Sequence, residues 1–335
     1  MKKIIYIILL LIVPFTSCSD WTDVETENIQ APIDRGEEYF KNLRAYKSTM
    51  FDRQITFGWF GGWTASGPSM MKRLKTAPDS VDIISIWGKY SDLKEEQMAD
   101  LKYVQEVLGT KVTYTIFAHE VPEPFEATTE GVQQYAKALA DTMYKYNYDG
   151  IDLDYEPGFG GVGPLVGPSS RYPNYKALMS DFVKALAQYF GPASESDKLL
   201  LIDGVPYDLN ADLPVYFNYG IVQSYDSSGD TDLQGRFNSA WAKGWKPEQY
   251  VFTEDFEKNW RNGGTTSYKH VTSDGETITV NSLKGMALFH PVINGKKMRK
   301  GGCGTYHMEY EYMHTDRDYK YLREAIQIMN PAIVE

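Results

Sequence analysis

Three acidic residues stand at every second position in one short stretch of the sequence. Asp152, Asp154 and Glu156 alternate with an isoleucine, a leucine and a tyrosine, and Pro157 follows directly. In a β-strand, side chains two residues apart lie on the same face, so a strand here carries three carboxyls on one face and apolar groups on the other. Crowded carboxyls repel and desolvate one another at a cost in stability. The pattern therefore indicates acid–base chemistry rather than a structural role.

Two other interpretations of this stretch stay open. A solvated acidic edge strand is one, although the apolar opposite face argues against it. A calcium or magnesium site is the other, since alternating carboxylates bind hard cations, but such sites usually need further oxygen ligands from a suitable loop.

The elements that must position these acids alternate regularly along the chain. Short apolar runs, rich in branched and aromatic residues, are separated by stretches with helical periodicity, as in βαβ units with a parallel sheet. The predicted strands are residues 55–59, 81–87, 112–117, 150–155, 199–205, 219–225, 250–252 and 304–310. The predicted helices are residues 94–108, 129–146, 175–189, 235–243 and 319–329.

This alternation predicts an α/β fold, a single-domain (β/α)₈ TIM barrel. The units occupy roughly 290 residues, close to the roughly 250 typical of that barrel. An open doubly wound sheet is the alternative, but residues 58–63 lack the G-x-G-x-x-G turn expected after its first strand. Residues 259–281 do not fit a compact unit. Their Asp274-Gly275 turn between β-prone stretches predicts an inserted hairpin that shapes the cleft.

The N-terminus has the pattern of a bacterial export signal. Two lysines precede an almost wholly apolar run over residues 4–14, which is too short to span a membrane, and residues 15–17 lead to Cys18. We predict a signal peptide over residues 1–17, lipidation of Cys18, an acidic tether over residues 18–37 and the barrel domain over residues 38–335. Simple secretion with cleavage nearby is the alternative.

The amino-acid composition disfavours some classes of binding partner. The formal net charge of −11 disfavours nucleic-acid binding, and two cysteines, Cys18 and Cys303, make neither a disulfide-dense scaffold nor a four-cysteine zinc site. Acidic residues just after the first cysteine resemble the surface-export signals of Bacteroidetes lipoproteins. The expected location is the outer surface of the outer membrane, with a lipid anchor as the membrane contact and a monomeric protein.

The acidic stretch belongs to a longer pattern. Asp149, Asp152, Asp154 and Glu156 fill every acidic position of D-x-x-D-x-D-x-E, which resembles the signature of glycoside hydrolase family 18. That family folds as a (β/α)₈ barrel with this motif on its fourth strand, the place that residues 150–155 hold here. Asp149 lies off the inward face, and we expect it to be structural.

A second resemblance lies at the end of the sixth predicted strand. Gln223 and Tyr225 form a Gln-x-Tyr pair like that of endo-β-N-acetylglucosaminidases, although Asp226 after the tyrosine also occurs in chitinases. The third strand reads Thr-Ile-Phe-Ala over residues 115–118, where chitinases commonly carry Ser-x-Gly-Gly. The resemblance therefore favours the endo-β-N-acetylglucosaminidases.

The resemblance implies a retaining, substrate-assisted hydrolysis of the GlcNAc-β1,4-GlcNAc core of N-glycans. Glu156 would be the acid and base, Asp154 would hold the acetamido N–H, Asp152 would orient Asp154, and Tyr225 would hold the acetamido oxygen. Gln223 is expected to contact substrate as well. A chitinase and a non-catalytic glycan-binding lipoprotein stay as alternatives, and an intact Glu156 favours the enzyme.

One further cluster, near the C-terminus, contains residue types that can bind metals. His307, Glu309, Glu311 and His314 are potential ligands, but their spacing matches no usual zinc motif. We expect no metal and no other cofactor. The aromatic side chains of Tyr306 and Tyr310 are predicted instead to line the sugar cleft or pack the barrel.

Overall fold

The computed structural model describes residues 35–159 and 161–332. The chain divides into two units after Gly36, and the second unit carries the barrel. The predicted signal peptide, Cys18 and all but the last three residues of the tether lie outside the described residues. Helix α1 (Gly36–Ser48) begins at Gly36, so the end of the predicted tether is helical.

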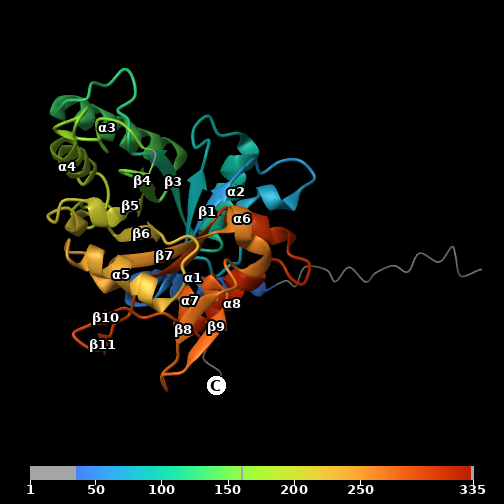
Figure 1. Ribbon diagram of the computed structural model, residues 1–335. Coiled ribbons are helices and arrows are strands. Elements are labelled where there is room, and N and C mark those ends of the chain that lie inside the picture. The colour runs from blue at the N-terminus through green and yellow to red at the C-terminus, as the bar shows by residue number, and fades with distance from the viewer. Residues whose placement is uncertain (1–34, 160, 333–335) are drawn as a thin grey trace, which may run out of the picture. The chain divides into compact units, whose positions relative to one another are not determined.

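The sheet is a closed barrel of eight strands, which confirms the predicted TIM barrel (Figure 1). Every neighbouring pair is parallel, and the last strand closes the barrel against the first. The strands are β1 (Ile55–Gly61), β2 (Ile83–Trp87), β3 (Lys111–Phe117), β4 (Gly150–Tyr155), β5 (Leu199–Gly204), β6 (Tyr219–Gln223), β7 (Tyr250–Asp255) and β12 (Gly302–Tyr306).

Helices cover the outside of the barrel (Figure 1). They are α2 (Glu95–Glu106), α3 (Thr129–Tyr146), α4 (Tyr175–Leu186), α5 (Asp230–Trp241), α6 (Phe256–Asn259), α7 (Ser282–Leu288) and α8 (Lys320–Met329). Within the described residues, no helix is both long and apolar enough to cross a bilayer.

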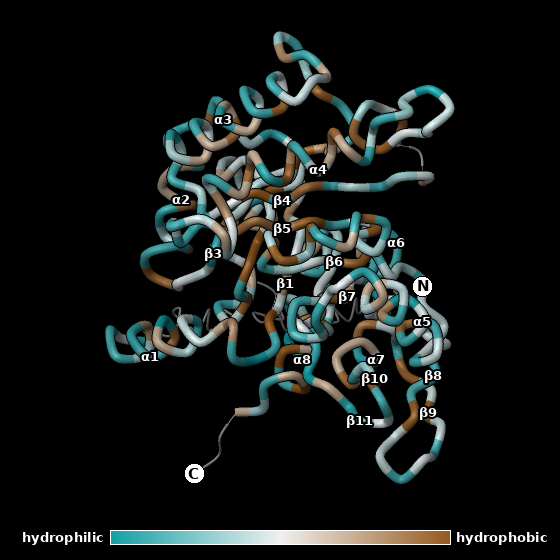
Figure 2. Tube along the Cα trace, turned by 90° about the vertical axis from the view of Figure 1, so that its left-hand side faces the viewer, coloured by the Kyte–Doolittle hydropathy of each residue, from teal (hydrophilic) through white to brown (hydrophobic). Residues whose placement is uncertain are grey.

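The core has two layers, and strand alternation produces them. One side of each strand packs under the helices, where the outward side chains of β4 (Ile151, Leu153 and Tyr155) join the large cluster. The other side fills the barrel with a smaller cluster that includes Phe57, Trp59, Leu201 and Ile221. Hydrophobic colour follows the barrel strands in Figure 2, while the loops are mostly hydrophilic.

Close pairing of β4 and β5 depends on Gly150. A Cβ atom there would lie 2.2 Å from the carbonyl oxygen of Leu199, so a side chain would push the strands apart. In the resulting register, Asp154 of β4 lies directly beside Asp203 of β5. The glycine at the start of the strand therefore helps to bring two acids together at its other end.

The inserted hairpin is present, as β8 (Tyr268–Val271) and β9 (Thr277–Val280). It packs against the start of α5, where Asp230 accepts hydrogen bonds from the Tyr268 hydroxyl at 2.8 Å and the Val271 N–H at 2.9 Å. None of its hydrogen bonds among the described residues reaches the carboxyls of β4. A shorter hairpin, β10 (Val292–Ile293) with β11 (Lys296–Lys297), lies nearby (Figure 2).

The predicted strand over residues 304–310 is wrong beyond Tyr306. His307 adopts a left-handed backbone conformation with φ of 51°, which ends the strand, and a 3₁₀-helix follows over Met308–Met313. Tyr310 therefore lies on that helix and not on a barrel strand. The sixth strand likewise ends at Gln223, so Tyr225 lies in the turn that follows it.

Candidate active site

Strand β4 directs Asp152 and Asp154 into the barrel, and both carboxyls are buried. Asp152 Oδ2 accepts a hydrogen bond from the Trp59 indole Nε1 at 2.9 Å and another from the Thr115 hydroxyl at 3.2 Å. Its donors are neutral groups on β1 and β3. The strand thus places a carboxyl inside the barrel and holds it there through uncharged donors.

Asp203 joins these two acids from the next strand. It is fully buried, and its Oδ1 accepts a hydrogen bond from the Gln223 amide at 2.9 Å. Asp203 pairs directly with Asp154 in the register of β4 and β5, and the charges of Asp152 and Asp154 act on it. Because three carboxyls buried side by side repel one another when ionised, the three acids form a cluster that retains protons.

The physical environment keeps protons on this cluster. Burial raises the pKa of Asp152 to about 6. Burial together with the negative charges of Glu156 and Asp152 raises the pKa of Asp154 to about 8. Burial and the charges of Asp152 and Asp154 also hold the pKa of Asp203 well above its ordinary value. The three groups are therefore not all ionised at neutral pH.

Glu156 lies just past the end of β4 and is less buried than the aspartates. Burial raises its pKa, while a hydrogen bond from Gln223 and the nearby His119 oppose that shift. The side chain of Gln223 thus contacts two acids, Asp203 and Glu156. A carboxyl with a raised pKa at the mouth of a barrel is better suited to general acid catalysis than an ordinary glutamate.

An aromatic wall stands beside these acids. The ring of Tyr306 lies 6.1 Å from that of Tyr225 in a stacked arrangement, 5.2 Å from Trp87 and 6.1 Å from Trp59, measured between centroids. Burial and the charges of Asp203 and other nearby acids raise the pKa of Tyr225 well above its ordinary value, so its hydroxyl stays protonated as a donor. The predicted Tyr225 and Tyr306 are therefore together at the site.

The acids open into a pocket of about 390 Å³. Asp154 and Glu156 line it with three residues that follow or end β3, Phe117, His119 and Glu120. The remaining lining comes from Gly161 and Val162 of the loop after β4. The pocket thus lies at the carboxyl ends of the strands, where barrel enzymes carry their active sites.

Tyr310 and the neighbouring His and Glu side chains lie on the segment after β12. Tyr310 stacks on the ring of His307 at 4.9 Å and packs against the large hydrophobic cluster. His307 Nδ1 contacts Glu309 at 2.6 Å, whereas Glu311 accepts hydrogen bonds from backbone N–H groups at the start of α8. In the part of the chain that the structure describes, no group of three or more His, Cys, Asp or Glu side chains is arranged to hold a metal ion.

Asp149 has the structural position expected for it. It stands immediately before β4, and its Oδ2 accepts hydrogen bonds from the Val112 N–H at 2.9 Å and the Gln105 amide at 2.7 Å. Lys111 contacts its other oxygen at 3.1 Å. These bonds tie α2, β3 and β4 together at the amino end of the barrel.

Asp203 was missed by sequence reasoning, although a signal was available. Leu199, Leu201 and Asp203 stand at alternate positions of one predicted strand, and the two leucines belong to the inner cluster. The parity alone would have directed Asp203 into the barrel. Its contact with Asp154, however, follows from the register between β4 and β5, which the sequence pattern does not specify.

The sequence matches the family model described as glycoside hydrolase family 18, BT1044-like, over residues 22–132 and 126–328. A solved structure of a selenomethionine glutamate-to-glutamine variant of BT1044 is 33% identical, with 88% of this chain and 92% of that chain covered and a TM-score of 0.76. No curated protein matches the sequence.

Two further structures share the fold. An endo-β-N-acetylglucosaminidase from Cordyceps militaris in its apo form is 24% identical, covering 88% of this chain and 97% of that chain, with a TM-score of 0.66. A double variant of that enzyme in complex with fucosyl-N-acetylglucosamine-Asn gives the same identity and coverages and a TM-score of 0.64.

Proposed function

The chain belongs to glycoside hydrolase family 18 and is a glycoside hydrolase, and from that premise we propose that it is an endo-β-N-acetylglucosaminidase that cleaves the GlcNAc-β1,4-GlcNAc core of N-glycans. One observation carries the proposal. Glu156, whose pKa is raised, and the buried Asp154 line one pocket at the end of β4, close to Tyr225. This set provides an acid for the leaving group and two partners for a 2-acetamido group.

We propose that the acetamido group of the substrate is the nucleophile. Asp154 lies on β4 and Glu156 is the second residue after it, just past the end of the strand, and both line the same pocket. A carboxylate nucleophile would have to approach the anomeric carbon from the face opposite the acid. Both carboxyls come from the end of the same strand, which supports substrate assistance, an exception to the two-carboxylate scheme.

In the first step, Glu156 gives its proton to the glycosidic oxygen as the bond from that oxygen to the anomeric carbon breaks. The acetamido oxygen forms a bond to the same carbon and closes an oxazoline ring. Asp154 accepts the acetamido N–H and stabilises the developing positive charge, while the Tyr225 hydroxyl donates to the acetamido oxygen. In the second step water attacks the anomeric carbon and gives a proton to Glu156, and the ring opens with retained configuration.

Asp203 and Asp152 support this cycle by holding protons. Asp154 must be ionised to stabilise a positive charge, yet burial and its acidic neighbours raise its pKa to about 8. A protonated Asp203 that donates a hydrogen bond to Asp154 stabilises the ionised form. We therefore assign the proton of the cluster to Asp203 when Asp154 faces substrate.

Two features support a glycan core over chitin as substrate. The Gln223-x-Tyr225 pair is typical of endo-β-N-acetylglucosaminidases. At the end of β3, the Phe117 side chain is 58% exposed in the place where chitinases commonly carry a small residue. The Cordyceps militaris enzyme that shares the fold is an endo-β-N-acetylglucosaminidase, and its variant was solved with a fucosylated GlcNAc-Asn ligand. A chitinase is the second candidate.

The test is mass spectrometry of a panel of glycoproteins and chitin oligomers after incubation with the protein. We expect each susceptible glycoprotein to lose its glycan and keep one GlcNAc on asparagine, and Glu156→Gln, the control, to leave the panel intact. Cleavage of chitin oligomers with an untouched glycoprotein panel would establish the chitinase instead.

We also propose that the mature protein is a monomeric lipoprotein of the outer membrane, with Cys18 as its anchor. The apolar run before Cys18 and the acidic residues after it support this proposal. Several acyl chains hold a protein far more firmly than the marginal binding of one. Cys18→Ala should abolish lipid attachment and membrane fractionation, whereas wild-type protein with an unlipidated N-terminus other than residue 18 would contradict the anchor.

A further inference from the structure

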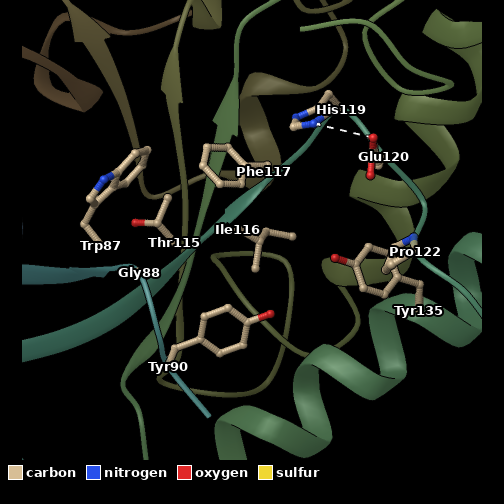
Figure 3. Close-up of a pocket in the computed structure, with 10 residues that line it drawn as sticks. All are labelled: Trp87, Gly88, Tyr90, Thr115, Ile116, Phe117, His119, Glu120, Pro122 and Tyr135. Atoms are coloured by element: carbon tan, nitrogen blue, oxygen red, sulfur yellow. Dashed lines mark ion pairs between the residues drawn. The ribbon is translucent and has the colours of Figure 1, made fainter. Parts of the chain in front are cut away.

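A second pocket adjoins the catalytic pocket at the end of β3. It has a volume of about 310 Å³ and shares Phe117, His119 and Glu120 with the catalytic pocket. Its other walls come from the loop after β2 and from α3 (Figure 3). A volume at the lower limit of ligand sites suits one sugar ring rather than a chain. Because the two pockets share a wall, one branched molecule can enter both.

Two tyrosine hydroxyls point into this second pocket. Figure 3 shows Tyr90 and Tyr135 directing their hydroxyls into the same space beside Ile116. Their rings are fixed from behind, since Tyr90 stacks on Tyr114 at 4.5 Å and Tyr135 stacks on Phe182 at 5.3 Å. Neither hydroxyl has a hydrogen-bond partner among residues 35–159 and 161–332. Two fixed hydroxyl groups are therefore available to hydrogen-bond a ligand in the pocket.

The rest of the wall favours an uncharged ring with one apolar face. Phe117 presents an exposed ring whose centroid lies 5.4 Å from that of Trp87, in an edge-to-face arrangement. None of the described residues that line the pocket is a lysine or arginine, and Glu120 stands at its rim beside His119, with 4.0 Å between the paired atoms. A carboxylate at the rim disfavours an acidic sugar. Aromatic faces with a few hydroxyl donors match a neutral pyranose.

We propose that this pocket binds an uncharged pyranose on a branch of the glycan whose core lies in the catalytic pocket, with Tyr90 and Tyr135 donating or accepting hydrogen bonds to its hydroxyls. The inference rests on the proposed function and adds to it a preference for branched over truncated glycans. The two tyrosines are specificity-determining residues, because they lie outside the pocket that contains the acids.

The experiment compares two glycopeptides with the same scissile bond. One carries a core with two mannose arms, and the other carries a core with a single mannose. The double variant Tyr90→Phe/Tyr135→Phe removes only two hydroxyl oxygens, and Tyr103→Phe, on the exposed face of α2, is the matched control. Thermal unfolding of each variant shows that the fold is kept.

We expect the double variant to lower kcat/KM on the branched glycopeptide by about tenfold, mainly through KM, which corresponds to two uncharged hydrogen bonds. Turnover of the single-mannose glycopeptide should stay within about twofold of wild type, as should both activities of Tyr103→Phe. An equal loss on both glycopeptides, or no loss on either, would overturn the pocket proposal while leaving the endo-glycosidase intact. Wild-type protein that cleaves neither glycopeptide would remove the proposed function, and this inference with it.

Discussion

The two ends of the barrel both bury ionisable groups but treat them differently. At the amino end, Asp82 accepts two hydrogen bonds from Arg53, the longer at 3.0 Å, and a third from the Thr56 N–H at 2.8 Å. Lys300 is fully buried there too, and its ammonium donates to Gln54 at 2.5 Å and to the carbonyls of Ala287 and Phe289 at 2.9 Å. Both of these buried charges have partners whose geometry satisfies them.

At the carboxyl end, acids face acids. Asp152, Asp154 and Asp203 are buried together, and each keeps one oxygen with no hydrogen-bond donor among the described residues. Their hydrogen bonds from other side chains come from neutral groups such as Trp59 and Gln223. The comparison separates two uses of buried charge: the amino end holds strands in place, whereas the carboxyl end keeps a costly arrangement that chemistry requires.

Glu156→Gln, at the carboxyl end, should give the largest effect on activity and should not lower stability. Without the proton donor, kcat should fall by about 10²- to 10⁴-fold, because general acid catalysis contributes that much. The unfolding temperature should stay the same or rise, since one crowded carboxyl becomes neutral. Steady-state kinetics and thermal unfolding check both parts, and near-normal turnover on an alkyl-linked glycan would exclude Glu156 as the acid.

Arg53→Met should give the opposite pattern at the amino end. It leaves the Asp82 carboxylate buried with only a backbone donor, which should lower the free energy of unfolding by about 3–5 kcal/mol. Activity of the folded variant at low temperature should be unchanged. Lys137→Met, which breaks an exposed pair with Asp141, is the control and should cost less than about 1 kcal/mol in urea unfolding. An equal loss in the free energy of unfolding for the two variants would contradict a structural role for the buried pair.

The acid cluster should also make stability depend on pH with a definite sign. The pKa values of Asp152, Asp154 and Asp203 are raised in the folded state, so the folded protein binds more protons than the unfolded chain above about pH 4. Stability should therefore fall as pH rises from about 5 to 8, by up to about 1.4 kcal/mol per pH unit for each extra proton. Denaturant unfolding of Asp154→Asn should show a shallower fall, and identical slopes would contradict the raised pKa.

Two substitutions of Asp203 should give the smallest effects. Together they distinguish a hydrogen-bonding role of its side chain from simple space filling. Asp203→Asn keeps a donor for Asp154 and an acceptor for Gln223, so kcat should fall less than about tenfold and the pH profile should stay in place. Asp203→Leu removes both, which should raise the pKa of Asp154 and move the acidic limb of the kcat profile to higher pH. Indistinguishable pH profiles for the two variants would show that Asp203 only fills space.

Local patterns predicted the barrel well, because each strand alternates or is wholly apolar and each helix repeats at its own period. They failed where the backbone conformation differs from the strand or helix that the residue types favour. Residues 304–310 form an aromatic run typical of a strand, yet the left-handed conformation at His307 ends it. Helix α7 (Ser282–Leu288), which is short and capped by the Asn281 side chain, was not predicted at all.

The candidate site shows the same limit. The β4 acids share a strand, so their common face follows from spacing alone. Asp203 and the aromatic wall come from other strands, and their contacts depend on register and barrel closure. Tyr310 was predicted, with Tyr306, to line the sugar cleft or pack the barrel, and it lies on the 3₁₀-helix after His307, packed against the core. Tyr225 and Tyr306 were nevertheless predicted, whereas Asp203, whose contact depends on the pairing of β4 with β5, was not.

The central claim, that the acidic end of the barrel serves an acetamido nucleophile, is tested most directly by one inhibition constant. A thiazoline analogue of GlcNAc that carries the core mannose mimics the cyclised intermediate, to which the site should be complementary. Competitive inhibition at least about 10²-fold tighter than by the parent free disaccharide is the expected result. A thiazoline that binds no more tightly than that disaccharide would contradict substrate assistance by Asp154 and Tyr225.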